Sequence, residues 1–197
     1  MKVSVLILAA GNASRMGKAK QLLPFKNTSL LEHAIHNALA SKADNVFCVL
    51  GAHANVIINH VGKSKVDFIY NPDWKQGLST SIISGINYVQ SLESIPDAVL
   101  VMLADQPFVD SKYIDLIIAT FFEKTNTIVA SQYKYNKGIP AIFPKEFYQT
   151  LLELKGDKGA RSLLNNKKLN VVTVFSKSEK TLVDIDLPED YDKLLQG

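Results

Sequence analysis

The residues best suited to chemistry stand near the N-terminus, where cations follow an apolar run and a turn of small residues. The run from Val3 to Ala10 is typical of a parallel strand buried on both faces. Next come small residues that can leave backbone N–H groups open, and then cations: Gly11, Asn12 and Ser14, followed by Arg15, Lys18 and Lys20. Amide dipoles and side-chain charges would point at one anion, so this stretch predicts a site for the phosphates of a nucleotide.

Spacing excludes two familiar phosphate-binding motifs at this place. A P-loop needs GxxxxGK[ST], which the stretch from Gly11 to Gly17 does not fit. A dinucleotide-binding fingerprint needs GxGxxG, and Ala13 stands where its second glycine should be. An ordinary glycine turn with solvated cations remains the structural alternative.

A second candidate for chemistry is Asp105, which follows the apolar run from Ala98 to Ala104. A carboxylate at the carboxyl end of a central strand faces the crevice in which α/β sheets bind ligands. Such a carboxylate needs a cation as partner, and Mg²⁺ prefers carboxylates together with phosphate oxygens and water. We therefore predict a magnesium site here, since Asp110 and Ser111 are better placed to cap the next helix.

Two further loops carry polar residues with both a structural and a functional interpretation. Ser79, Thr80 and Ser81 can cap the helix that follows them or contact a ligand with their hydroxyls. Asp157 can cap a helix that carries Arg161 inward. Trp74, the only tryptophan, is assigned to packing.

Apolar patterns along the chain alternate between strands and helices. They predict helices at 29–40, 55–60, 78–89, 111–124 and from 188, and strands at 3–10, 46–50, 66–70, 98–104, 127–131, 141–143 and 171–175, with a last strand entering the acidic segment 183–190. Residues 138–140 are predicted to shape a turn into the strand at 141–143. This alternation favours an α/β fold, a three-layer α/β/α sandwich with a Rossmann-like, mainly parallel sheet. The length of 197 residues suggests a single domain over 1–197.

Composition narrows the classes of function. With 47% hydrophobic and 21% charged residues the chain is ordinary globular protein, and a net charge of +3 without a basic block gives no indication of nucleic-acid binding. The single cysteine, Cys48, lies in an apolar run and excludes an internal disulfide or a cysteine zinc site. No targeting segment or membrane-length apolar run is present, so we expect a soluble cytoplasmic protein with no membrane partner.

Residues 8–24, LAAGNASRMGKAKQLLP, resemble the signature LAAGxSxRMGxxKxLLP of the MobA-like nucleotidyltransferases. Ala10 makes the chain more similar to their molybdenum cofactor cytidylyltransferase branch than to the guanylyltransferase branch, which usually shows LAGG. KGIPAIF from Lys137 resembles the family's GxPxxF, with Ile139 where many relatives have histidine. Four more segments resemble the family in the same order: GLSTSI from Gly77, LADQP from Leu103, GDKGAR from Gly156 and DIDLPED from Asp184.

The resemblance implies the nucleotide-diphospho-sugar transferase type of sheet and a set of site residues. The implied catalytic residues are Arg15, Lys20, Asp105 and Asp186, with Asp105 and Asp186 holding Mg²⁺, or Mn²⁺ in its place. The implied nucleotide-binding residues are Leu8, Ala9, Ala10, Gly11, Arg15, Lys20, Ser79, Thr80, Ser81 and Asp105. The implied acceptor-binding residues are Gln106, Pro107, Gly138, Pro140, Asp157 and Arg161.

The reaction implied by the resemblance is transfer of CMP from CTP to the terminal phosphate of molybdopterin, the organic part of the molybdenum cofactor. A molybdenum hydroxylase that receives the product is a further implied partner. Three alternatives stay open: a guanylyltransferase, a sugar-phosphate nucleotidyltransferase on the same fold, and a non-catalytic chaperone that delivers finished cofactor. SRMG disfavours the sugar enzymes, which more often show a GxGTR-type turn, and a pure binder would need no pair of metal carboxylates.

Overall fold

A seven-stranded sheet forms the centre of the protein. The computed structural model describes residues 1–12, 19–62, 66–124 and 126–196. The strand order is β5-β4-β1-β6-β8-β7-β9, and all neighbours run parallel except β8, which is antiparallel to both β6 and β7. The strands are β1 (Val3–Ala9), β4 (Asn45–Leu50), β5 (Asp67–Tyr70), β6 (Ala98–Leu103), β7 (Ile128–Gln132), β8 (Lys137–Pro144) and β9 (Val171–Val174).

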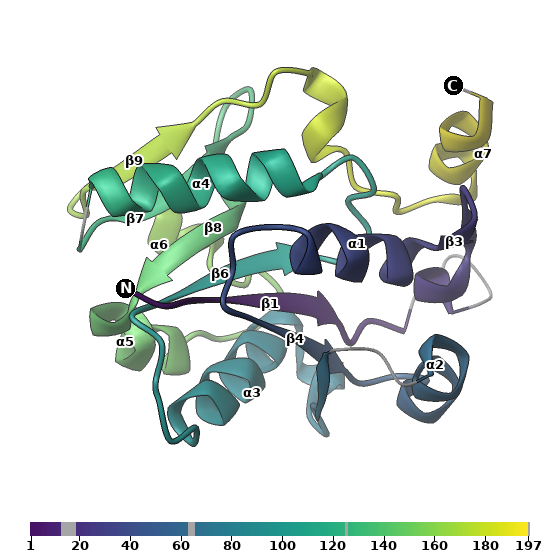
Figure 1. Cartoon of the computed structure of the whole chain (residues 1–197), viewed down its shortest axis with the longest axis horizontal. Helices are drawn as coiled ribbons and strands as arrows, with labels where there is room; N and C mark the ends of the chain where they lie inside the picture. Colours follow the sequence, from purple (N-terminus) through teal and green to yellow (C-terminus); the bar gives the residue numbers. More distant parts are fainter. Residues whose placement is uncertain (13–18, 63–65, 125, 197) are drawn as a thin grey trace.

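Helices cover both faces of this sheet (Figure 1). On one face α1 (Leu30–Leu39) and α4 (Ser111–Glu123) bury their apolar residues, and on the other α3 (Leu78–Gln90), α5 (Tyr148–Leu152) and α6 (Arg161–Leu164) do so. The remaining elements are α2 (Ala54–Val61), α7 (Pro188–Gln196), the hairpin of β2 (Pro24–Phe25) and β3 (Thr28–Ser29), and the 3-10 turns η2 (Lys20–Leu22), η3 (Trp74–Gln76), η4 (Lys145–Phe147) and η5 (Glu179–Leu182). The predicted three-layer α/β/α architecture is confirmed.

Local sequence accounts for where α1 and α4 begin. Ser29 caps α1 in a capping box, because its hydroxyl accepts from the Glu32 N–H while the Glu32 carboxylate accepts from the Ser29 N–H. Asp110 caps α4 by accepting from the N–H of Tyr113 at 2.8 Å. Asp105 is therefore not used as a helix cap, as the sequence predicted.

Two segments differ from their predictions. Gly138 and Pro140 lie inside β8 rather than in a turn before it, because Gln132 pairs with Lys137 and extends the ladder. Residues 183–187 form no strand: the Ile185 N–H donates to the carbonyl of Asp105 at 3.0 Å, and the Ile185 side chain is buried in a small cluster with Phe25 and Leu30. A backbone hydrogen bond to residue 105 and the burial of Ile185 thus hold this segment in place of the expected strand pairing.

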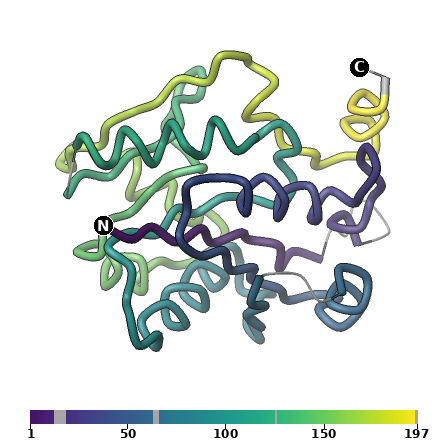
Figure 2. Tube along the Cα trace, in the orientation of Figure 1, coloured from purple at the N-terminus to yellow at the C-terminus, as the bar shows by residue number. Residues whose placement is uncertain are grey.

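The C-terminal helix α7 lies beside the β2–β3 hairpin, on the side of the molecule opposite the N-terminus (Figure 2). The C-terminal helix α7 packs against the β2–β3 hairpin, where the Tyr191 hydroxyl donates to the Pro24 carbonyl at 2.6 Å. This contact holds the segment before α7 close to the β2–β3 hairpin and to the neighbouring Lys20. Asp186 is therefore brought near Lys20 although the two are far apart in the chain.

Cys48 and the membrane prediction can both be compared with the structure. Cys48 is fully buried within β4, where it packs as a small hydrophobic residue, and burial raises the pKa of its thiol far above the ordinary value. Within the described ranges, every helix is too short or too polar to cross a bilayer.

Candidate active site

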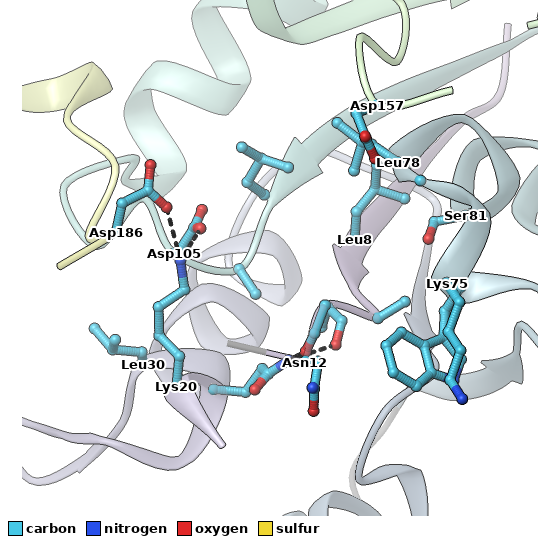
Figure 3. A pocket seen from close by; sticks show the side chains of 18 residues that line it. Leu8, Asn12, Lys20, Leu30, Lys75, Leu78, Ser81, Asp105, Asp157 and Asp186 are labelled. Carbon is cyan, nitrogen blue, oxygen red and sulfur yellow. Dashed lines mark hydrogen bonds and ion pairs between the residues drawn. The ribbon is translucent and has the colours of Figure 1, made fainter. Parts of the chain in front are cut away.

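A cavity of about 530 Å³ opens at the carboxyl ends of β1 and β6 (Figure 3). This is the edge at which parallel α/β sheets bind their ligands. Lys20, Asp105 and Asp186 lie at one end of the cavity, and Leu78, Ser81 and Lys75 lie at the other (Figure 3). The remaining lining residues are Leu8, Ala9, Ala10, Gly11, Asn12, Gln21, Leu30, Trp74, Gly77, Leu103, Ala104 and Asp157.

The charged end is built around the ammonium of Lys20. Its Nζ lies 2.6 Å from Oδ2 of Asp105 and 3.0 Å from Oδ1 of Asp186. Burial acts to lower the pKa of Lys20, but attraction from the two carboxylates outweighs burial, so the net shift of this pKa is upward. Asp105 and Asp186, remote in sequence, thus meet at one point.

The backbone turn after β1 is held open by Gln21. Its side-chain amide donates to the carbonyls of Ala9 and Gly11, both at 2.8 Å, and the Ala52 N–H donates to the Ala10 carbonyl at 3.1 Å. These bonds fix the three carbonyls while the turn itself lines the cavity. Gln21 stands beside Lys20 in the quoted motif, but no role was predicted for it.

The start of α3 forms the opposite wall, and the three hydroxyl residues there differ in their surroundings. Ser81 lines the cavity and accepts from Nδ2 of Asn71 at 3.1 Å. Thr80 donates to the carbonyls of Asp73 and Gly77, while Ser79 is fully buried. Ser81 is therefore the hydroxyl residue that the cavity wall presents to a ligand, and Thr80 has a local structural use.

Trp74 lines the cavity, so its assignment to packing alone was incomplete. A Cβ added to Gly51 would lie 2.6 Å from Cβ of Trp74 and 2.8 Å from the Ala10 carbonyl. Gly51 therefore lets the indole approach the turn after β1. The available signal in the sequence was that the only tryptophan stands three residues before Gly77, the first residue of GLSTSI.

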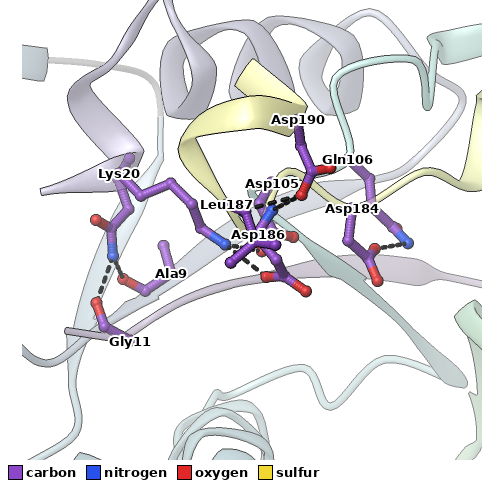
Figure 4. A network of polar contacts seen from close by, with 10 residues as sticks. Ala9, Gly11, Lys20, Asp105, Gln106, Asp184, Asp186, Leu187 and Asp190 are labelled. Atoms are coloured by element: carbon purple, nitrogen blue, oxygen red, sulfur yellow. Dashed lines mark hydrogen bonds and ion pairs between the residues drawn. The ribbon is translucent and has the colours of Figure 1, made fainter. Parts of the chain in front are cut away.

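A polar network lies behind the charged end (Figure 4). The Gln106 amide donates to Asp184 Oδ1 and to the Tyr133 hydroxyl, both at 2.8 Å, and the Tyr133 hydroxyl donates to the Ile139 carbonyl at 2.6 Å. Burial first, and then repulsion from Asp105 and Asp186, raises the pKa of Asp184 to about 6. Asp184 is a residue that sequence reasoning missed, although it belongs to the same DIDLPED segment.

Asp184→Asn is expected to stabilise the protein in a pH-dependent way. Because the pKa of Asp184 is raised above its ordinary value of 3.8, the folded state binds this proton more tightly than the unfolded state. The ionised carboxylate therefore lowers stability above pH 6, and this penalty vanishes as the pH falls toward 4. Asparagine keeps an acceptor for Gln106, so chemical denaturation should show a gain of about 1–2 kcal/mol at pH 7.5. The gain should disappear near pH 4, and a gain independent of pH would contradict the assignment.

The predicted acceptor residues do not gather in the cavity wall. Asp157 lines the cavity, whereas Gln106, Pro107 and Pro140 are buried outside it. Gly138 lies beneath the Tyr133 ring, where an added Cβ would come within 2.6 Å of Cε2. We predicted that Arg161 points inward, but it is exposed at the first position of α6. The predicted cap Asp157 is also wrong, because Ala160 is the residue that precedes this helix. The acceptor role of this set stays a prediction.

Arg15, predicted to contact the triphosphate, lies outside the described residues. The other predicted nucleotide-binding residues at the N-terminus, Leu8, Ala9, Ala10, Gly11 and Lys20, all line the cavity. Among the described residues, no group of three or more histidine, cysteine or acidic side chains forms a ready metal cage. A cation here would therefore need ligands from a substrate in addition to Asp105 and Asp186.

Residues 5–171 match the MobA-like NTP transferase domain. The purine catabolism protein PucB of Bacillus subtilis is 29% identical over 197 residues, which cover 95% of this chain and 93% of PucB. Nicotine blue oxidoreductase of Paenarthrobacter nicotinovorans is 26% identical over 98% of this chain and 96% of its own. The molybdenum cofactor cytidylyltransferase of Escherichia coli is 34% identical over 90 residues, 45% of this chain and 46% of that protein.

Solved structures of two mycobacterial proteins superimpose on almost the whole chain. A mycobacterial homologue of Rv0371c superimposes with a TM-score of 0.87 at 28% identity, covering 98% of this chain and 95% of its own. Rv0371c of Mycobacterium tuberculosis in complex with manganese superimposes with a TM-score of 0.83 at 25% identity over the whole of both chains. These two mycobacterial proteins thus share the sheet and its helices with this chain.

Proposed function

The chain belongs to the MobA-like NTP transferase family and is a nucleotidyltransferase. On this basis we propose that it moves CMP from CTP to the terminal phosphate of molybdopterin. An oxygen of that phosphate forms a new bond to the α-phosphorus of CTP, and the α–β bond breaks to release pyrophosphate. One observation carries the proposal: Lys20, Asp105 and Asp186 meet at one end of a cavity whose other end is lined by Trp74 and Ser81. We assign the triphosphate to the first end and the base to the second.

The side chains have little proton transfer to do in this reaction. The attacking phosphate is already an anion, so the protein must align two anions and neutralise their charge. Lys20 lies at the charged end of the cavity and would neutralise the departing pyrophosphate. Arg15 is proposed for the same task from its place in the motif.

Asp105 and Asp186 fit a divalent cation. Oδ1 of Asp105 is buried and has no hydrogen-bond partner among the described residues, which leaves one carboxylate oxygen without its electrostatic complement. We assign Mg²⁺, or Mn²⁺, to these two carboxylates together with phosphate oxygens. The cation would supply positive charge against the oxygens of the α-phosphate.

The base and ribose are assigned to the other end. The turn from Ala9 to Gly11 presents backbone groups that Gln21 holds in place, and Ser81 presents a hydroxyl. Trp74 offers an apolar face beside that turn. The preference for cytosine rests on Ala10, which stands where the guanylyltransferase branch has glycine.

The acceptor is assigned to the side of the cavity that Asp157 lines, with Gln106, Pro107, Gly138, Pro140 and Arg161 as further candidates. Molybdopterin as acceptor is supported by the similarity to the Escherichia coli cytidylyltransferase, which covers 45% of this chain. A molybdenum hydroxylase would then receive the dinucleotide product.

Release of pyrophosphate tests the proposal. The protein is incubated with Mg²⁺ and molybdopterin, and with CTP or GTP in parallel. We expect pyrophosphate with CTP, and a rate at least about tenfold lower with GTP, since discrimination by hydrogen bonds to a base commonly exceeds that ratio. Ala10→Gly introduces the glycine of the guanylyltransferase branch, so it should reduce the ratio of the rate with CTP to the rate with GTP.

Each alternative predicts a different result in the same assay. A faster reaction with GTP would make the protein a guanylyltransferase. Turnover with a sugar phosphate in place of molybdopterin would move it to the sugar enzymes. Binding of CTP and molybdopterin without pyrophosphate would indicate a chaperone and would contradict the proposed transfer.

A further inference from the structure

Lys20 occupies the position between the two carboxylates that the proposed function assigns to a divalent cation. Its ammonium bridges Asp105 Oδ2 and Asp186 Oδ1, and its side chain is only 14% exposed. An ammonium and a divalent cation cannot share these oxygens, because both would lie within about 3 Å of the same carboxylates and would repel each other. In the absence of a ligand, Lys20 is therefore a competitor of the metal.

The backbone around Lys20 is fixed, whereas its side chain can move. The Leu23 N–H donates to the Lys20 carbonyl at 3.1 Å, and the neighbouring Gln21 is bonded to the turn after β1. A lysine has a flexible stem of four carbons, so its ammonium can leave the carboxylates without any change in the backbone. A triphosphate in the cavity would offer this ammonium a second anionic partner.

We infer that Lys20 makes the divalent-cation site of Asp105 and Asp186 depend on the nucleotide. Without a triphosphate the ammonium holds both carboxylates and excludes free metal ions. A triphosphate attracts the ammonium, frees the carboxylate oxygens and adds its own, so that metal and nucleotide bind together. The inference rests on the proposed function and adds a specificity to it: the enzyme selects the metal–nucleotide complex over either part alone. Because binding energies are linked, the metal must strengthen nucleotide binding by the same factor.

The test is the affinity of the full chain for free Mn²⁺, measured by electron paramagnetic resonance without nucleotide. Lys20→Met removes the charge and keeps the length of the side chain. We expect this variant to bind Mn²⁺ at least about tenfold more tightly than the natural protein, because the competing charge is gone. A non-hydrolysable CTP analogue should strengthen Mn²⁺ binding strongly in the natural protein and much less in the variant.

Lys75 supplies the matched control. It lines the same cavity, but its Nζ lies 5.5 Å from the centre of the Trp74 ring and has no ion pair with a carboxylate among the described residues. Lys75→Met makes the same chemical change, so it should leave the affinity for free Mn²⁺ as it is. An equal gain in both variants would mean that general charge, not the bridge, sets the affinity, and it would overturn the inference.

The outcomes separate this inference from the proposed function. If Lys20→Met binds Mn²⁺ no more tightly than the natural protein does, the inference is overturned. If Mn²⁺ binding by Lys20→Met is then lost when Asp105→Asn is added, the metal site of the proposed function is still supported. Mn²⁺ binding that does not depend on Asp105 overturns both. Circular dichroism checks the fold of each variant, and Lys20→Gln provides the second uncharged variant for the same comparison.

Discussion

Asp105→Asn is expected to lower pyrophosphate release from CTP by about 10²- to 10³-fold while leaving the fold intact. Asparagine has the shape of aspartate but lacks its charge, and a neutral amide is a poor partner for both Lys20 and a divalent cation. The carboxylate contacts Lys20 at 2.6 Å, and its other oxygen is buried without a described partner. The Ile185 N–H bonds to the backbone carbonyl of residue 105, so this anchor survives the substitution. Initial rates under saturating CTP and thermal unfolding are the two measurements.

Asp110→Asn is the matched control for that substitution. Asp110 caps α4 through its side chain, and asparagine caps helices about as well as aspartate. Both variants lose one carboxylate, so they change the net charge equally. Turnover should therefore stay near its natural value in Asp110→Asn. Equal turnover in the two variants would contradict the assignment of Asp105 to the metal and the triphosphate.

The fold could be predicted where local pattern decides the structure. The apolar runs around Val3, Val46 and Ala98 form central strands because each is long enough and apolar enough to be buried on both faces. The helices α1 and α4 begin at ordinary caps, Ser29 and Asp110. By contrast, the segment 183–187 has the composition of a strand, but burial of Ile185 in a distant cluster decides its path.

The candidate site was predictable to the same extent. Asp105 follows directly from the rule for strand ends, and the structure places it beside Lys20. Which aspartate of DIDLPED faces Lys20 depends on Ile185, whose burial leaves Asp186 on the side of Lys20 and Asp184 on the side of Gln106. That arrangement depends on tertiary packing, so the resemblance to the family, and not the local hydrophobic pattern, singled out Asp186 in the sequence.

The contribution of Trp74 could not be predicted for a related reason. Its place in the cavity wall depends on Gly51, a residue at the end of another strand that leaves room for the indole. Spatial neighbours of this kind are not adjacent in the chain. A tryptophan in a loop therefore looks like ordinary packing until the second residue is known.

Gly77→Ala is expected to lower the stability of the protein strongly without changing its charge. Gly77 has φ of 108° and ψ of 175°, a conformation that is essentially restricted to glycine. An added Cβ would lie 2.4 Å from Oδ1 of Asp157 and 2.7 Å from the backbone carbon of Gly156. Because one of these neighbours is backbone, a rotation of side chains cannot relieve the contact. We expect the free energy of unfolding to fall by about 3 kcal/mol or more, measured by chemical denaturation.

Gly62→Ala separates the two causes of that loss. Gly62 also has a positive φ, of 68°, but a Cβ added to it would meet no described atom within 4 Å. The control therefore measures backbone strain without the steric contact, and it should cost about 1–2 kcal/mol.

Since Ser79 donates its N–H to the Gly156 carbonyl at 3.1 Å, the contact at Gly77 should also displace the start of α3 and the Asp157 loop together. Both line the cavity, so Gly77→Ala should raise the KM for CTP as well, whereas Gly62→Ala should not. If Gly77→Ala and Gly62→Ala lose the same stability and the KM for CTP is unchanged, the start of α3 and the loop of Asp157 are not coupled through Gly77.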